Sequence, residues 1–225
     1  MIIAHVSDTH GKFPPIPKSA EIVISSGDDL PNTTRGNEEV EPYFQRVWIN
    51  ANVENYKKWL DGRTFIRCAG NHDFCPMLCP TLTDANIPAI DVTNNYYVFN
   101  ELGIYGFPYI PYINGEWKFE STVSDMSRHV RRLKDILVKN KIDILVAHAP
   151  IANILDFAYG DHIGNPQIKD LFEYMLEEKH LPKLYAHGHA HENYGTELIG
   201  NMLISNAATT VNFIKYDPSS GFKPI

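Results

Sequence analysis

Short apolar runs recur along the chain, and each is closely followed by polar residues. The runs span residues 2–6, 21–26, 64–69, 142–147 and 184–186. Continuous apolar runs of this length predict strands buried on both faces. The residues that follow them are Asp8-Thr9-His10, Gly27-Asp28, Gly70-Asn71-His72-Asp73, His148 and Gly188-His189-Ala190-His191. We therefore expect strands whose ends carry clustered polar side chains.

Three other segments have apolar residues at helical spacing. They span residues 40–60, 122–139 and 165–176. In the first, Val40, Phe44 and Val47 begin the apolar stripe. The second begins with Thr122-x-x-Asp125, the pattern of a capping box. We interpret the three stripes as helix faces packed against the core.

Further strand-like segments lie near the middle and the end of the chain. They span residues 96–99, 102–107, 193–199, 201–205 and 211–216. The chain therefore mixes β-α-β units with meandering strands. This pattern favours an α/β fold with two mixed sheets packed together and helices outside, in one domain over residues 1–225.

Composition and charge narrow the classes of partner. The chain has 225 residues, of which 44% are hydrophobic and 21% are charged, an ordinary globular balance. A net charge of −7 argues against an extended nucleic-acid surface or an anionic membrane as partner. No apolar stretch approaches the roughly 20 residues that a membrane helix needs.

Three cysteines and the absence of a leader sequence favour reduced thiols and a cytoplasmic location. Cys75-x3-Cys79 resembles half of a zinc site. No second pair at suitable spacing completes it, so we interpret these residues, with Cys68, as free cysteines.

The polar motifs carry the candidate chemistry. Seven of their side chains are good metal ligands: Asp8, His10, Asp28, Asn71, His148, His189 and His191. Ligands of open α/β sheets gather beyond the carboxyl ends of strands, so motifs far apart in sequence can converge there. Taken singly, each motif is equally well explained by a turn or a strand-end residue. All five motifs in this order, each after an apolar run, rarely occur together by chance.

This series of motifs resembles the calcineurin-like metallophosphoesterase superfamily, whose pattern runs D-x-H, GD, GNH[DE], H and GHxH. The resemblance spans residues 8–191. It implies a four-layer αββα sandwich, with two mixed β-sheets flanked by helices, and two divalent metal ions. A mixed set of imidazole, carboxylate and amide ligands suits manganese first, with iron, zinc, nickel and cobalt as alternatives, rather than calcium.

The resemblance also implies a role for each residue. Asp8, His10, Asp28 and His191 would hold one metal, and Asp28, Asn71, His148 and His189 would hold the other. Asp28 would bridge the pair. His72 would face the substrate, oriented by Asp73. Two metals about 3.5–4 Å apart clamp the attacking and leaving oxygens of a phosphoryl displacement, in which a hydroxide held between them attacks. His72 would stabilise the phosphoryl oxygens or protonate the leaving alkoxide.

Two features favour diesters among the possible substrates. Many phosphomonoesterases of the superfamily continue the second motif as GDxxDRG, whose arginine clamps the phosphate. Here Asp29-Leu30-Pro31-Asn32 follows Asp28, and Arg35 is the remaining candidate for that role. The aromatic stretch 105–119 and the sequence GHAHENYG at residues 188–195 resemble the small metallophosphoesterase-domain proteins related to fetal-brain protein 239. This resemblance implies a phosphodiesterase acting on nucleotide-type or cyclic nucleotide substrates.

For two groups of residues, the sequence supports two alternative placements each. Tyr109, Tyr112 and Trp117 either form an aromatic wall that stacks a nucleobase or pack a loop against the sandwich. Asp156, Asp161 and His162 lie either beside the cleft or on a solvated loop.

Three classes of function therefore remain. The first is a phosphodiesterase whose partner is a small, nucleotide-like phosphoester. The second is a phosphomonoesterase or nucleotide pyrophosphohydrolase that uses the same metal pair. The third is a binding scaffold without catalysis, which is disfavoured because no ligand and no catalytic histidine is missing. The physiological substrate and the oligomeric state stay open.

Overall fold

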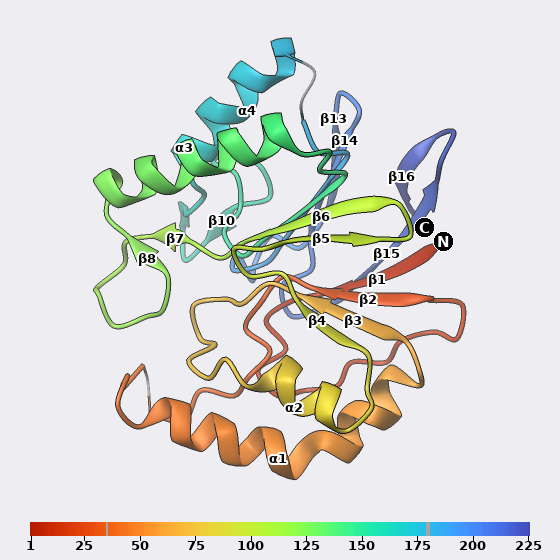
Figure 1. Ribbon diagram of the computed structural model, residues 1–225. Coiled ribbons are helices and arrows are strands. Elements are labelled where there is room, and N and C mark those ends of the chain that lie inside the picture. Colours follow the sequence, from red (N-terminus) through yellow and green to blue (C-terminus); the bar gives the residue numbers. More distant parts are fainter. Residues whose placement is uncertain (35, 179–180) are drawn as a thin grey trace.

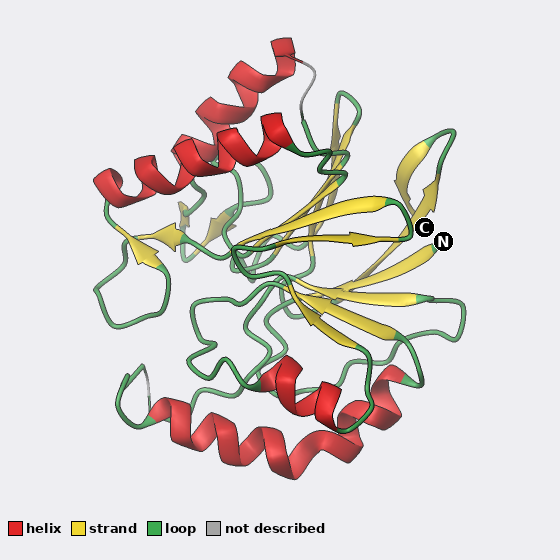
Figure 2. Ribbon diagram, viewed as in Figure 1, coloured by secondary structure: helices red, strands yellow, loops and turns green. Residues whose placement is uncertain are grey.

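The structure, a computed structural model, describes residues 1–34, 36–178 and 181–225. Two six-stranded sheets lie face to face between two pairs of helices (Figure 1). Figure 2 shows the four layers of helix, sheet, sheet and helix. The expected four-layer αββα architecture is confirmed.

The first sheet has the strand order β16-β15-β1-β2-β3-β4. Its strands are β1 (Ile2–Val6), β2 (Ile22–Ser25), β3 (Thr64–Arg67), β4 (Ala89–Asp91), β15 (Val211–Asp217) and β16 (Gly221–Pro224). Strands β1 to β4 are parallel, whereas β15 and β16 are added antiparallel at one side. This parallel arrangement directs the carboxyl ends of β1, β2 and β3 to the same edge.

The second sheet has the order β13-β14-β12-β9-β6-β5. Its strands are β5 (Tyr96–Phe99), β6 (Leu102–Phe107), β9 (Ile144–Ala147), β12 (Leu184–His187), β13 (Gly195–Ile199) and β14 (Met202–Asn206). The four central strands are parallel, and the outer two are antiparallel hairpin partners. Two short ribbons complete the strands: β7 (Ile110–Pro111) with β8 (Glu120–Ser121), and β10 (Phe157–Ala158) with β11 (Asp161–His162).

The buried strands divide their side chains between two cores, because successive residues of a strand point to opposite faces. In β9, Ile144 and Val146 face the core between the sheets, whereas Leu145 faces the helices over the second sheet. In β3, Ile66 belongs to the core between the sheets and Phe65 to the core beneath the helices of the first sheet. This two-sided burial is why these strands are continuous apolar runs.

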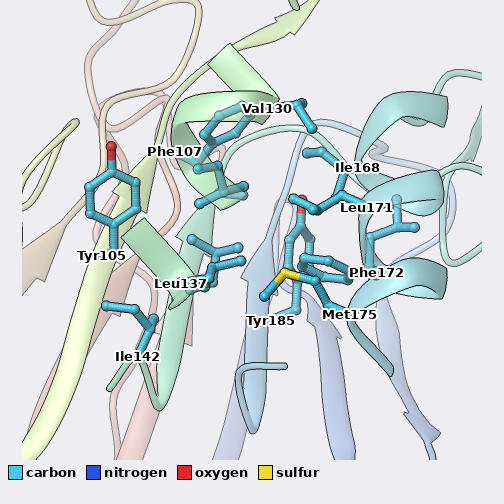
Figure 3. Packing of buried hydrophobic residues seen from close by; sticks show 14 of the residues in the cluster. Tyr105, Phe107, Val130, Leu137, Ile142, Ile168, Leu171, Phe172, Met175 and Tyr185 are labelled. Carbon is cyan, nitrogen blue, oxygen red and sulfur yellow. The ribbon is translucent and has the colours of Figure 1, made fainter. Parts of the chain in front are cut away.

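Helices α3 (Val123–Lys139) and α4 (Pro166–Glu178) cover the second sheet. In α3, Met126, Val130, Leu133 and Leu137 form the buried stripe that the sequence predicts. Thr122 caps the helix, since its side chain accepts a hydrogen bond from Asp125 N. Figure 3 shows Val130 and Leu137 of this stripe in one cluster with residues of α4 and of the sheet.

Helices α1 (Glu41–Leu60) and α2 (Leu78–Asp84) cover the first sheet. The expectation for the start of α1 is wrong, because Val40, Phe44 and Val47 are exposed. Glu41 and Gln45 are buried in their place. Both side chains accept hydrogen bonds from backbone N–H groups of neighbouring loops, so this end of the helix packs on polar backbone rather than on apolar side chains.

Two further findings concern the cysteines and the membrane. All three cysteines are free and buried, and Cys75 and Cys79 pack in the core between the first sheet and its helices, Cys79 as a residue of α2 itself. Among the helices in the described part of the chain, none is both long and apolar enough to cross a bilayer.

Candidate metal centre

Five loops meet where the carboxyl ends of β1, β2, β3, β9 and β12 converge from the two sheets. Direct backbone hydrogen bonds join the first two loops: Asp8 N donates to Gly27 O at 2.9 Å, and His10 N donates to Asp28 O at 2.9 Å. His189 N donates to Asp8 Oδ2 at 3.0 Å and so ties the last loop to the first. The two sheets thus share one polar centre.

The backbone of this centre is held in an uncommon conformation. Asp8, His10, Asp28 and His189 have φ values of 53°, 44°, 56° and 68°. Non-glycine residues rarely adopt the left-handed region, and at such positions the surrounding structure must compensate the cost, of order 1 kcal/mol or more each. Such conformations concentrate at functional sites.

Two glycines allow the loops to pass directly over the carboxylates. A Cβ atom at Gly70 would lie 2.2 Å from Asp28 Oδ1, and one at Gly188 would lie 2.2 Å from Asp8 Oδ2. No side chain fits in either place. The glycines of the third and fifth motifs are therefore required by close approach to the two buried carboxylates.

Among the residues that the structure describes, three groups of side chains could each hold a metal ion. They are Asp8, His10 and His191; Asp8, Asp28 and His148; and His10, Asp28 and His72. In each group the candidate ligand atoms lie within 4.8 Å of one another. Asp8 and Asp28 are 3% and 1% exposed, so two carboxylates are buried side by side among imidazoles.

His148 is oriented for ligation from behind. Its Nδ1–H donates to Ser26 O at 2.8 Å, which directs Nε2 into the centre. There Nε2 lies 2.8 Å from Asn71 Oδ1 and 3.3 Å from Asp28 Oδ2. Histidines that ligate metals commonly donate their other ring N–H to a backbone carbonyl in this way. His189 stands next to it, with ring centroids 5.0 Å apart.

The charges and pKa values of the buried side chains in this centre favour a bound cation. Burial opposes ionisation of Asp8, but the hydrogen bond with His191 and the charges of His148 and His191 together outweigh it and lower the carboxyl pKa to about 2. Burial likewise disfavours a charged His148, yet Asp28 and Asp8 raise its pKa to about 10. Burial, followed by His148, lowers the pKa of His189 to about 3, so this ring is neutral and able to ligate. Buried carboxylates with neutral imidazole and amide oxygen form a donor set that fits divalent cations.

His72 lies at the edge of this centre. Its backbone N–H donates to Asp28 Oδ1 at 2.8 Å, and its Nε2 lies 3.8 Å from Asp28 Oδ2. Asn32 Nδ2 lies 2.7 Å from the ring Nδ1, and the Trp117 ring is 4.2 Å away, centroid to centroid. Burial lowers the pKa of His72. An amide at Nδ1 and a tilted indole ring therefore hold the imidazole.

The expectation that Asp73 orients His72 is wrong. The Asp73 carboxylate accepts hydrogen bonds from Asp28 N at 2.8 Å, Leu30 N at 3.1 Å and Gly70 N at 2.8 Å. Adjacent side chains leave the backbone in different directions, so Asp73 points beneath the loops while His72 points into the cavity. Asp73 thus joins the second and third motifs, and Asn32 takes the place beside His72 that the sequence interpretation gave to Asp73.

Arg67 supports this arrangement from below and was missed in the sequence. Its side chain is 1% exposed and forms ion pairs with Asp29 at 2.8 Å, Asp73 at 2.6 Å and Asp91 at 3.4 Å. Its position inside an otherwise apolar run could have identified it from the sequence, since a charged residue at a buried strand position needs partners of opposite charge.

A cavity of about 560 Å³ opens from the centre. Tyr112, Trp117 and His162 line it together with Asp28, Asn71, His72, His189 and His191. Tyr109 is not among its lining residues; its ring stacks on His129 with centroids 3.5 Å apart. Asp156 is buried and holds His162, Asp161 is exposed, and Arg35 lies outside the described residues.

Comparisons with known proteins agree with this geometry. A model of the family described as calcineurin-like phosphoesterase matches residues 1–193. Metallophosphoesterase domain-containing protein 1 of Homo sapiens is 24% identical, over 95% of this chain and 68% of that protein. The protein MJ1162 of Methanocaldococcus jannaschii is 24% identical, over 99% of this chain and 98% of its own length.

One solved structure aligns with 100% of this chain and 98% of its own, with a TM-score of 0.67 and 14% sequence identity. At that identity the likeness concerns the fold.

Proposed function

Because the chain belongs to the calcineurin-like phosphoesterase family, we propose that this metal-dependent phosphoesterase is a phosphodiesterase for small nucleotide-like substrates. The family hydrolyses phosphoesters with a divalent metal pair, and the chain has side-chain groups suited to hold one. The proposal of a small, nucleotide-like diester rests on the cavity. Its volume of about 560 Å³ leaves room for more than a phosphate, and no lysine or arginine is among its described lining residues.

We assign the metal ligands as two sets that share Asp28. Asp8, His10, Asp28 and His191 would hold one ion, and Asp28, Asn71, His148 and His189 would hold the other. Asp28 belongs to one group with His10 and to another with His148, which supports its place as the shared ligand, and the His189 ring lies 5.0 Å from that of His148. Manganese is the proposed metal, since borderline divalent ions suit a mixed nitrogen and oxygen donor set.

When bound, the metal pair supplies Lewis-acid stabilisation of the phosphoryl oxygens and activates water for attack. In this proposal, His72 is the protein side chain that acts directly on the phosphoryl group. If Asn32 Nδ2–H donates to the ring Nδ1, the proton of the neutral ring is on Nε2, which is the atom nearer to Asp28 and the centre. This tautomer favours His72 as a hydrogen-bond donor to a phosphoryl oxygen, where charge develops in the transition state.

The charge of the cavity supports a diester over a monoester. A phosphate monoester carries roughly one more negative charge than a diester, and proteins commonly meet it with arginine. The described lining residues offer no such cation. Tyr112 is 58% exposed and lines the cavity, so its ring is available to stack on a base or another flat group.

A paired assay tests this proposal. The manganese-loaded protein is given bis(p-nitrophenyl) phosphate and p-nitrophenyl phosphate under the same conditions. We expect a higher kcat/KM for the diester. Preference for the monoester would support a phosphomonoesterase on the same metal pair, and inactivity with both would support a binding scaffold.

The cytoplasmic location and the extent of the domain over residues 1–225 stay predictions.

A further inference from the structure

One histidine that lines the cavity, His162, belongs to none of the five polar motifs. His162 ends β11 and Tyr159 lies in the turn between β10 and β11, and both residues line the cavity that Asp28 and His72 also line. The His162 side chain is 54% exposed. The proposed chemistry at phosphorus uses neither residue.

A buried carboxylate holds the His162 ring in one orientation. Asp156, which is 1% exposed, has Oδ1 at 2.6 Å from the ring Nδ1. Its Oδ2 accepts hydrogen bonds from Asn153 N at 2.8 Å and Gly164 N at 3.1 Å, so the carboxylate is itself fixed. A carboxylate only accepts, so Nδ1 carries the proton and the neutral ring presents Nε2 as an acceptor. In the described part of the chain, no hydrogen bond to this Nε2 is formed.

The ribbon that carries His162 is also attached to the loop of the fifth motif. Phe157 N donates to Asn193 Oδ1 at 3.1 Å, and Tyr159 N donates to Glu192 Oε1 at 3.2 Å. Asn206 Nδ2 donates to Leu155 O at 3.1 Å and to Ala190 O at 2.9 Å. These bonds fix the position of His162 relative to the loop that carries His189 and His191. Such preorganisation is what a recognition residue requires.

We propose that His162 is a specificity residue that recognises the nucleoside part of the substrate. Its Nε2 accepts a hydrogen bond from an N–H or O–H group that lies beyond the reacting phosphate. Asp156 acts through His162 as a positioning residue. The inference rests on the proposed phosphodiesterase function, and it adds a polar contact to a cavity whose lining also includes the largely apolar side chains of Tyr112, Ile113 and Ile163.

Two substitutions separate recognition from support of the loop. In His162→Asn the side-chain amide stands near the place of Nδ1, so the bond to Asp156 is kept but the Nε2 acceptor is lost. In His162→Gln the amide reaches the place of Nε2 and keeps an acceptor there. The neighbouring substitution Asp161→Asn is the matched control, because Asp161 is exposed and does not line the cavity.

The substrates are the p-nitrophenyl diester of thymidine 5′-phosphate and bis(p-nitrophenyl) phosphate, which release the same chromophore. For His162→Asn we expect a KM raised about threefold to tenfold with the thymidine diester, the effect of one lost hydrogen bond. Its kcat with that substrate and both constants with bis(p-nitrophenyl) phosphate should be unchanged. His162→Gln and Asp161→Asn should resemble the wild type. N3-methyl and 3′-O-methyl thymidine diesters distinguish the N–H from the O–H donor, since one of them should abolish the effect.

Equal losses with both substrates, or an unchanged KM in His162→Asn, would overturn the recognition role. If the wild type hydrolyses neither diester, the proposed function fails. Titration calorimetry of the thymidine diester against the metal-loaded wild type and His162→Asn still decides the inference, because binding needs no turnover. Equal affinities in that titration, or no measurable binding to either protein, would refute it.

Discussion

His72 is held from three sides by residues of different loops. Asn32 Nδ2 lies 2.7 Å from the ring Nδ1, the Trp117 ring lies 4.2 Å away at a tilt of 38°, and the His10 ring approaches with centroids 5.0 Å apart. The third motif alone placed this histidine in the site, whereas its orientation depends on an asparagine 40 positions earlier. At the scale of a residue, the orientation of His72 is therefore set by its neighbours in space.

Replacing Asn32 by leucine should lower kcat without releasing the metals. We expect a fall of about tenfold, smaller than the factor of about 10² expected for His72→Ala, because a misaligned donor is less costly than an absent one. Steady-state kinetics and metal analysis of the purified variants measure both quantities. In the double variant, Asn32→Leu should have no further effect beyond His72→Ala. A fully additive loss would mean that Asn32 acts independently of His72.

At the scale of elements, strand β3 supports the centre through Arg67. The guanidinium is buried with two buried carboxylates, Asp29 and Asp73, and Asp73 in turn binds the backbone of the second and third motifs. Burial, opposed by Arg67, raises the pKa of Asp29 to about 6. The charged arginine thus limits the rise that burial alone would cause in the pKa of Asp29. The ion-pair cluster thus joins the fold of the first sheet to the geometry of its loops.

Replacing Arg67 by leucine should destabilise the metal-free protein by about 3–5 kcal/mol, because it leaves buried carboxylates without a partner. Urea unfolding at pH 7.5 measures the change. Asp91→Asn is the matched control, since the Asp91 side chain is 30% exposed and its contact with Arg67 is the longest of the three at 3.4 Å. A loss as large in the control as in Arg67→Leu would contradict the role given to the buried pair.

At the scale of the molecule, the two sheets are joined by polar contacts as well as by the apolar core. The His5 ring of β1 lies 2.8 Å from Ser205 Oγ in β14 and 3.0 Å from Ser26 Oγ after β2. Burial, and then the neighbouring His187, lowers the pKa of His5 from 6.5 to about 3. Burial also lowers the pKa of His187 to about 4, so both histidines are neutral in the interior. Their protonation at low pH should therefore destabilise the packing of the two sheets.

Stability should therefore depend on pH through His5. Between pH 6.5 and about 3 the unfolded chain binds a proton that the folded ring refuses, so the free energy of unfolding falls as the pH falls. The slope for this residue is at most about 1.4 kcal/mol per pH unit. Urea unfolding of the metal-free wild type and His5→Gln, from pH 7.5 to 4.5, measures it.

The wild type should lose its advantage over His5→Gln as the solution becomes acidic. Asp29 has a raised pKa and acts in the opposite direction, but it is common to both proteins and cancels in the difference. A difference that stays constant with pH would show that His5 is not a buried neutral histidine.

The sequence by itself determined the strands buried on both faces, the helix stripe of α3 and the convergence of the polar motifs. These features depend on local periodicity and on chain direction, because parallel strands must end at one edge. It did not predict α2, β4 or β16, or the polar buried start of α1. Those elements are short, or are packed on the backbone of other loops.

Tertiary structure alone decided which partner each polar side chain has. Asn32 with His72, Asp73 with the Asp28 backbone, and His5 with Ser205 are separated by 40, 45 and 200 positions. It also directed Tyr109 away from the cavity and His162 into it. Hydrogen bonds of this kind depend on directions and distances of a few ångströms between chain segments, which residue type and spacing do not specify.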